Sequence, residues 1–169
     1  IGAGPWAATD AAVGLWIDAA QAAGDRVSEI GAGPTLAMAA LFGPLPVPDA
    51  IVRCEELLTR TGGDRRSEAL IQRSLGRLHA MRGDFDIARE LYRGARRALD
   101  ELGWTFQATL TSLDAGPIEV LAGDLETAIA ELQRDFDTLD RLGERNFIST
   151  VAASLSVALI EAGRYDEAD

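Results

Sequence analysis

The stretch Gly83-Asp84-Phe85 returns 40 residues later as Gly123-Asp124-Leu125 and after another 40 as Gly163-Arg164-Tyr165. An alanine follows each triplet at the same offset, at Ala88, Ala128 and Ala168. A fixed period of this size predicts one supersecondary unit that is copied along the chain. Because a single copy cannot bury its apolar face alone, neighbouring copies are expected to stack into a solenoid.

A second kind of break alternates with these triplets, and it also contains glycine, the residue favoured just past a helix end. These breaks are Gly24-Asp25, Gly63-Asp64, Gly103-Trp104 and Gly143-Glu144. Between breaks, apolar residues recur at steps of three and four, as one face of a helix requires. We therefore expect helices over 8–23, 26–42, 47–61, 65–81, 84–101, 105–121, 124–141 and 145–161, with the start of another. This predicts about four and a half helical hairpins.

The first part of the chain follows the pattern less closely. Pro44, Pro46 and Pro48 replace the expected glycine turn, and Pro48-Asp49 could open a helix. The phrase Ile1-Gly2-Ala3-Gly4-Pro5 recurs at 30–34, where we expect it to break or shorten the helix from 26. Gly116-Pro117 should likewise kink the helix 105–121. We predict one helical repeat domain over 1–169, with divergent repeats over 1–61 and regular repeats over 62–169.

A weaker form of the pattern runs backwards from Ala88. Ala12 and Ala50 precede Ala88 by multiples of 38, and Trp16 stands four residues after Ala12, as Tyr92 does after Ala88. These positions are therefore expected to pack in the same way.

Composition and charge exclude several classes of protein. The chain of 169 residues carries a formal charge of −11, which would repel both duplex nucleic acid and an anionic membrane. The single cysteine, Cys54, fits a reducing compartment, and no signal peptide or long apolar run is visible. We expect a cytoplasmic protein. Because Asp169 falls inside a pattern that should continue, we expect a fragment of a longer polypeptide.

Several of these residues resemble tetratricopeptide repeats. Leu75-Gly76, Gly83-Asp84-Phe85, Ala88, Tyr92 and Ala95 fit that pattern at its own spacing, and two further copies fit at Gly116 to Ala128 and Leu155 to Ala168. The period of 40 exceeds the family's usual value of about 34, and Glu119 replaces a bulky apolar residue. The resemblance implies an all-α fold, a right-handed α-solenoid of antiparallel helix pairs.

Two longer phrases, at 46–58 and 78–85, resemble repeat arrays of large bacterial regulators. In actinobacterial proteins such arrays follow cyclase and ATPase modules, and LuxR-type multidomain regulators carry similar C-terminal repeats. The resemblance implies a part in signal transduction or transcription regulation. In such a protein the repeat array would bind a partner or sense an effector and would not catalyse a reaction.

No combination of residues predicts catalysis. His79 is the only histidine, and no nucleophile and orienting acid accompany it in the pattern of a triad. Cys54 and His79 do not supply the several ligands that a metal site needs, and Cys54 sits at an apolar helix position. Gly2-Ala3-Gly4 lacks the third glycine of a dinucleotide fingerprint. The carboxylates of Asp135, Asp137 and Asp140 are expected on a solvated helix face. We expect no enzyme activity, no cofactor and no metal.

The candidate binding residues are Arg73, Arg77, Leu113 and Val157. Each falls on the first helix of a pair, which lines the concave side of a repeat array. Arg73 and Arg77 could meet a carboxylate of a partner bidentately, or could pair within the chain with Glu68 or Glu55-Glu56. The matching apolar positions could bind an amphipathic peptide, or a neighbouring domain of the parent chain could cover them.

These observations favour a non-enzymatic module for binding a protein or peptide segment, within a larger bacterial regulator. Two alternatives stay open. One is a domain that senses a small effector, which would need a large apolar pocket with a few polar groups. The other is self-association, including a homodimer, because cut solenoid ends expose apolar faces.

Overall fold

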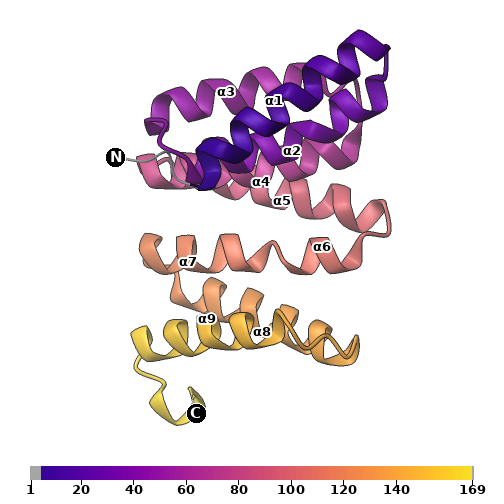
Figure 1. The fold of residues 1–169 in the computed structure, drawn as a ribbon. Helices are drawn as coiled ribbons and strands as arrows, with labels where there is room; N and C mark the ends of the chain where they lie inside the picture. Colours follow the sequence, from indigo (N-terminus) through magenta and orange to yellow (C-terminus); the bar gives the residue numbers. More distant parts are fainter. Residues whose placement is uncertain (1–4, 169) are drawn as a thin grey trace. The chain divides into compact units, whose positions relative to one another are not determined.

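The computed structural model describes residues 5–168, apart from the side chains of Pro5 and Ala7. The candidate fingerprint Gly2-Ala3-Gly4 lies outside the described residues. The regular elements described are all helical (Figure 1): α1 (Pro5–Ala23), α2 (Arg26–Phe42), α3 (Val47–Arg60), α4 (Arg65–Arg82), α5 (Phe85–Glu101), α6 (Thr105–Thr109), α7 (Ser112–Ala122), α8 (Leu125–Arg141), α9 (Ile148–Glu161) and the 3-10 turn η1 (Tyr165–Glu167). The expected all-α class is confirmed, and consecutive helices pack antiparallel.

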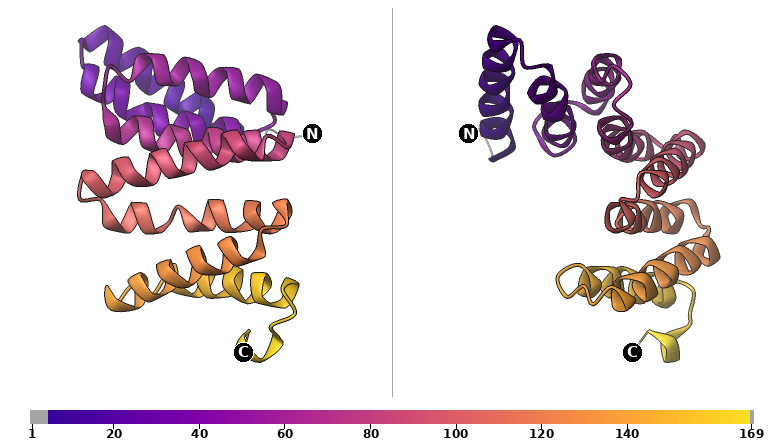
Figure 2. Two further views of the ribbon diagram at one scale, coloured as in Figure 1. Left: turned by 180° about the vertical axis from the view of Figure 1, so that it is seen from behind. Right: turned by 90° about the vertical axis from the view of Figure 1, so that its right-hand side faces the viewer.

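The chain forms two compact units, which divide within α5 between Ala98 and Leu99. In the first unit, α2 packs against α1, α3 and α4, and α3 also packs against α4. In the second unit, α7, α8 and α9 pack against one another, with α6 against α8 and η1 against α9. The further views show the helices of each unit running alongside their neighbours (Figure 2).

The same hydrogen-bonded turn ends five helices at intervals of 20 residues. After each of these helices a glycine adopts a left-handed conformation, with φ between 67° and 92° at Gly83, Gly103, Gly123, Gly143 and Gly163. The next N–H then reaches back five residues, as from Asp84 to the carbonyl of His79 (2.9 Å) and from Asp124 to that of Glu119 (2.9 Å). This is the Schellman motif, which satisfies the last carbonyls of a helix. The predicted glycine breaks are confirmed, and two of these turns make one 40-residue period.

A different turn joins α2 to α3. Gly43 has an ordinary φ of −83°, and Pro46 precedes the first residue of α3 with φ −57°. Pro48 stands in the first turn of that helix. Backbone N–H groups in the first turn have no intrahelical acceptor, so the N–H that proline lacks costs no helical hydrogen bond. The prediction that the proline-rich segment opens a helix is therefore confirmed.

Two helices continue through a proline at which the sequence predicted a distortion. The helix α2 continues through Pro34, and α7 continues through Pro117. In both cases the preceding residue is glycine, Gly33 or Gly116. A proline disfavours helical conformation in the preceding residue partly by clashing with its Cβ, and glycine has none. The expectation that the phrase at 30–34 breaks or shortens the helix was wrong for this reason. The kink expected at Gly116-Pro117 stays a prediction, because a continuous helix can still bend at a proline.

The segment 105–121 is instead broken earlier, between α6 and α7. The Ala108 carbonyl accepts both the backbone N–H (3.1 Å) and the hydroxyl (2.7 Å) of Thr111, so it is occupied before the chain reaches Ser112. Thr109 bonds back in the same way to the carbonyl of Thr105. Such local side-chain bonds compete with the regular helical ladder. We attribute the break to this run of hydroxyl residues.

A side-chain cap also delays the start of α9. The Glu144 carboxylate accepts hydrogen bonds from the backbone N–H groups of Asn146, Phe147 and Ile148, at 2.8, 2.7 and 3.1 Å. These bonds hold the segment in a turn, so the helix expected from 145 begins at Ile148. Beyond α9, the chain forms only the 3-10 turn η1 where a further helix was expected to start.

Each unit has its own apolar core. The first core includes Ala50, Cys54 and Ile71, and the second includes Ala128, Leu132 and Val151, all fully or almost fully buried. Burial raises the pKa of the Cys54 thiol to about 11, so it behaves as the predicted small apolar residue. The repeated alanines Ala88 and Ala128 are fully buried, as close helix packing requires, whereas Ala168 is partly buried.

The backward extension of the pattern holds only in part. Ala50 is fully buried, but Ala12 and Trp16 are exposed. The inner face of α1 instead carries Val13 and Ile17, which stand one residue later. The sequence comparison of α1 with α5 was therefore out of phase by one residue, enough to turn the compared side chains toward solvent.

Two glycines at equivalent repeat positions allow close helix contacts. A Cβ on Gly76 would lie 3.0 Å from the Tyr92 ring, and a Cβ on Gly116 would lie 2.8 Å from Leu132. In both pairs the partner follows the glycine by 16 residues. The pairs α4–α5 and α7–α8 therefore share one contact geometry.

We expect Gly116→Ala to lower the free energy of unfolding by about 1–3 kcal/mol, because the buried Leu132 cannot move aside freely. Urea unfolding followed by circular dichroism measures this change. The matched control is Gly14→Ala in α1, where no atom lies within 4 Å of the new methyl group. That control should raise the stability by up to ~1 kcal/mol. Equal stabilisation by both substitutions would contradict the close contact.

Candidate functional site

Two of the four predicted site residues lie on one face of α4. An Asp64 carboxylate caps the start of this helix by accepting the Ser67 N–H at 3.3 Å, and Gly83 ends it. Arg73 and Arg77 stand one turn apart between these limits, and both are half-buried. Their spacing of four residues places them on the same face, as the sequence predicted.

Arg77 contacts an aromatic side chain that the sequence did not connect with it. Its guanidinium carbon lies 5.1 Å from the centroid of the Phe42 ring, within the range of a cation–π interaction. The indole of Trp6 stacks on the same ring at 5.1 Å with an interplanar angle of 28°. This contact joins the end of α2 to α4 and to α1. Glu68, one proposed internal partner of the arginines, instead accepts the Thr61 hydroxyl at 2.8 Å.

Exposed apolar side chains stand one helical turn from each of the two contacting residues. Met38 stands one helical turn before Phe42 on α2, and Met81 stands one turn after Arg77 on α4. The side chains of Met38, Phe42 and Met81 are 43%, 42% and 64% exposed. We call Met38, Phe42, Arg77 and Met81 the α2–α4 patch. Steps of four on two helices that pack together were the signal that could have identified it.

The other two predicted residues lie on the second unit. Leu113 is half-buried on α7 and packs against the second core. Packing within the unit is therefore sufficient reason for an apolar residue at this position. Val157 on α9 is 54% exposed. The structure thus brings Arg73 and Arg77 together in one unit and places Leu113 and Val157 in the other.

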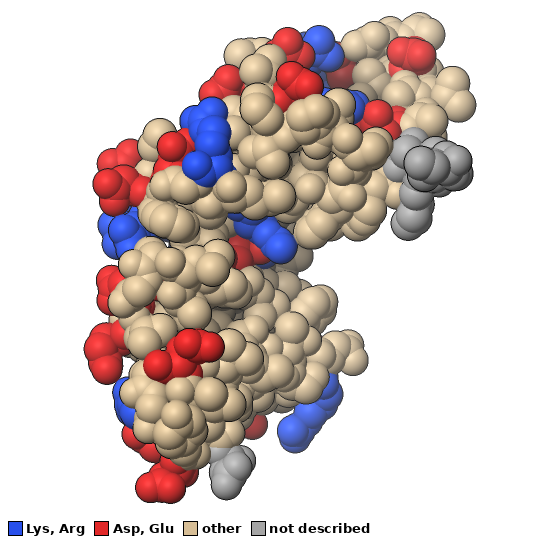
Figure 3. Space-filling view, turned by 90° about the vertical axis from the view of Figure 1, so that its left-hand side faces the viewer, with Lys and Arg blue, Asp and Glu red and all other residues tan. Residues whose placement is uncertain are grey.

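The charge of the chain is divided unevenly. Residues 1–98 carry 12 arginines and 12 acidic residues, whereas residues 99–169 carry 4 arginines and 15 acidic residues. Within the first unit, the stretch 65–97 carries nine arginines and four acidic residues. Wide uncharged areas separate the charged side chains on the face seen in Figure 3. The stretch that contains α4 is therefore rich in arginine, although the whole chain is acidic.

His79 belongs to a small polar cluster at the α4–α5 turn. The buried imidazole Nδ1 lies 3.2 Å from Asp84 Oδ2 and 3.3 Å from Arg82 Nη2, and Arg82 Nε donates to the same carboxylate. The Arg82 hydrogen bond, followed by that of His79, lowers the pKa of Asp84. The cluster fastens the turn, and it accounts for the only histidine as a structural residue.

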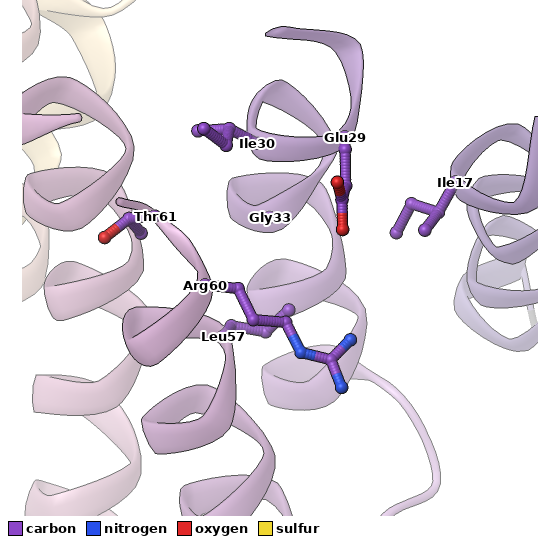
Figure 4. A pocket seen from close by; sticks show the side chains of 7 residues that line it. All are labelled: Ile17, Glu29, Ile30, Gly33, Leu57, Arg60 and Thr61. Carbon is purple, nitrogen blue, oxygen red and sulfur yellow. The ribbon is translucent and has the colours of Figure 1, made fainter. Parts of the chain in front are cut away.

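A small pocket lies between α1, α2 and α3. Its lining combines the apolar side chains of Ile17, Ile30 and Leu57 with the charged Glu29 and Arg60 (Figure 4). The cavity volume of about 20 Å³ suffices for about one water molecule. This pocket is much too small for an effector of the usual ligand size.

Three carboxylates in the second unit are buried, and the expectation that Asp135 lies on a solvated helix face was wrong. Asp114 and Glu119 on α7 are less than a tenth exposed, and Asp135 on α8 is fully buried, with Arg134 Nε at 3.1 Å from its Oδ1. Glu119 occupies the position where the repeat pattern has a bulky apolar residue. Among residues 5–168, no group of three or more His, Cys, Asp or Glu side chains is arranged to hold a metal ion.

The turn cluster has a defined pH dependence. Because the pKa of Asp84 is lowered below its ordinary value of 3.8, its contribution to stability is present above that value and is lost as the pH falls through the lower folded pKa. We expect Asp84→Asn to reduce the midpoint of thermal unfolding at pH 7. The difference from the wild type should shrink steadily below about pH 4. A difference that stays constant down to pH 2 would contradict this role of the carboxylate.

Comparisons with protein-family models and with curated proteins found no match. Within residues 5–168, no helix is both long enough and apolar enough to cross a membrane. The site must therefore be interpreted from its own residues.

Proposed function

We propose that the chain is a non-enzymatic protein-interaction module, a tetratricopeptide-like array that belongs to a larger bacterial signalling or transcriptional regulator. In this proposal the helix pairs form a right-handed α-solenoid. The main support is the turn that recurs every 20 residues from Asp84 to Arg164. The matching contacts of Gly76 with Tyr92 and of Gly116 with Leu132 support a common repeat unit. Proteins built from such units present extended binding surfaces.

Side chains on the first helix of each helix pair support a role in binding. On α4, Arg73 and Arg77 provide planar donors suited to carboxylates, and on α9 Val157 provides exposed apolar area. The partner in this proposal is a protein or peptide segment, or a neighbouring domain of the same parent chain. The water-sized pocket of the first unit gives no support to the alternative of a small effector.

Capture experiments test this function. The purified chain, immobilised through an added terminal tag, should retain a specific protein from a lysate of the organism that encodes it. We expect Arg73→Glu with Arg77→Glu to weaken the binding of that protein tenfold or more, equivalent to at least about 1.4 kcal/mol. The matched control is Arg145→Glu, a charge reversal at an exposed position before α9.

Two results would contradict the proposal. One is the absence of any protein that binds the chain saturably when the purified components are mixed. The other is turnover of a substrate by the chain alone, since the proposal assigns it no chemistry.

A further inference from the structure

We propose that the α2–α4 patch is the docking site for an acidic amphipathic helix of a partner protein. The apolar side chains of that helix would pack on Met38, Phe42 and Met81, and its carboxylates would face Arg73 and Arg77. This inference rests on the proposed function, and it specifies the surface and the chemistry of the partner.

The apolar part of the patch is unusual for this chain. The protein contains two methionines, and both stand in the patch with large exposed fractions. Methionine is unbranched and polarizable, so it adapts to the shape of a partner and is frequent on surfaces that bind helices. Burying three such side chains would contribute about 1.5–3 kcal/mol for each one fully covered.

The aromatic residue in the patch is already held in place. Phe42 is fixed between the Trp6 indole on one side and the Arg77 guanidinium on another, although it remains 42% exposed. A side chain that is ordered before binding loses little conformational entropy when a partner covers it. Exposed but rigid aromatic residues are typical anchors of interfaces.

The spacing of the patch suits a helix. Met38 and Phe42 are separated by one turn of α2, and Arg77 and Met81 by one turn of α4, so each pair spans about 6 Å along its axis. Apolar side chains at positions i and i+4 of a partner helix have the same separation. An amphipathic helix could therefore contact both pairs at once.

The local charge selects an acidic partner. The stretch 65–97, which contains α4, has five more arginines than acidic residues. Arg73 and Arg77 are on the side of α4 that continues into Met81, so they flank the apolar area. Carboxylates placed beside the apolar face of a partner would lie near this positive charge, which favours association and discriminates against basic helices.

The two methionines provide a direct probe of the patch. With ¹³C-methyl methionine incorporated, the folded chain should give two methyl signals, which Met38→Leu and Met81→Leu assign. The probe is a synthetic 18-residue helix with leucine and phenylalanine on one face and glutamate elsewhere. We expect both signals to shift saturably with this peptide. A shuffled peptide of the same composition should cause smaller shifts, and a version with lysine in place of glutamate should cause none.

Substitutions test which residues contribute to the affinity for the peptide. Met81→Glu should weaken binding of the acidic peptide tenfold or more, because it adds a like charge to an apolar contact. The matched control is Leu121→Glu, which alters an exposed apolar residue of α7 in the second unit and should leave binding unchanged. Neither side chain is buried, so both variants should fold.

Oxidation tests the same surface without a mutation. Hydrogen peroxide transfers one oxygen atom to each methionine thioether, giving a sulfoxide and water. We expect oxidation to abolish peptide binding while the unfolding midpoint changes by no more than that of Leu121→Glu, because both methionines are exposed.

The proposal would be overturned by an unshifted pair of methyl signals at millimolar peptide, or by equal binding of the glutamate and lysine peptides. Methyl shifts that depend on protein concentration without peptide would assign the patch to a second copy of this chain instead. If a captured partner binds Met81→Glu as tightly as the wild type, the docking site fails while the module function stands. If the peptide binds and no partner is ever captured, the surface stands and the module function fails.

Discussion

The structure depends on a constraint that acts at the ends of its helices. A left-handed glycine and one hydrogen bond across five residues stop the helix after the same interval at Gly83, Gly103 and Gly123. A fixed interval gives residues that stand 40 positions apart the same phase within the repeat. The burial of Ala88 and Ala128 and the close approach at Gly76 and Gly116 follow from that shared phase.

Most of the fold could be predicted because these turns are encoded locally. Glycine followed by a polar residue marks a helix end wherever it occurs, and apolar residues at steps of three and four mark the buried side. The misassigned details have a different origin. Rules for proline assume a preceding side chain, which Gly33 does not have, and the break after α6 depends on the Thr111 hydroxyl bonding back to Ala108. Composition and period do not reveal either effect.

The candidate site was predictable only within a single helix. The spacing of Arg73 and Arg77 placed both on one face of α4, and the structure agrees. Phe42, which contacts Arg77, lies 35 residues earlier in the chain, and no local pattern relates the two. Methionines on a helix are more often part of a core, so the sequence alone does not indicate that Met38 and Met81 are exposed. Surface features that arise from packing between helices need the tertiary structure.

The unequal division of charge gives the two units different responses to ionic strength. The first unit has as many arginines as acidic residues, so dissolved salt acts on it mainly by screening the attraction within ion pairs such as Arg53–Asp10. The second unit carries the entire excess of eleven negative charges, and mutual repulsion among them strains it whenever counterions are scarce. Dilution of salt therefore loosens one half of the molecule selectively, and a bound cationic molecule would tighten that same half.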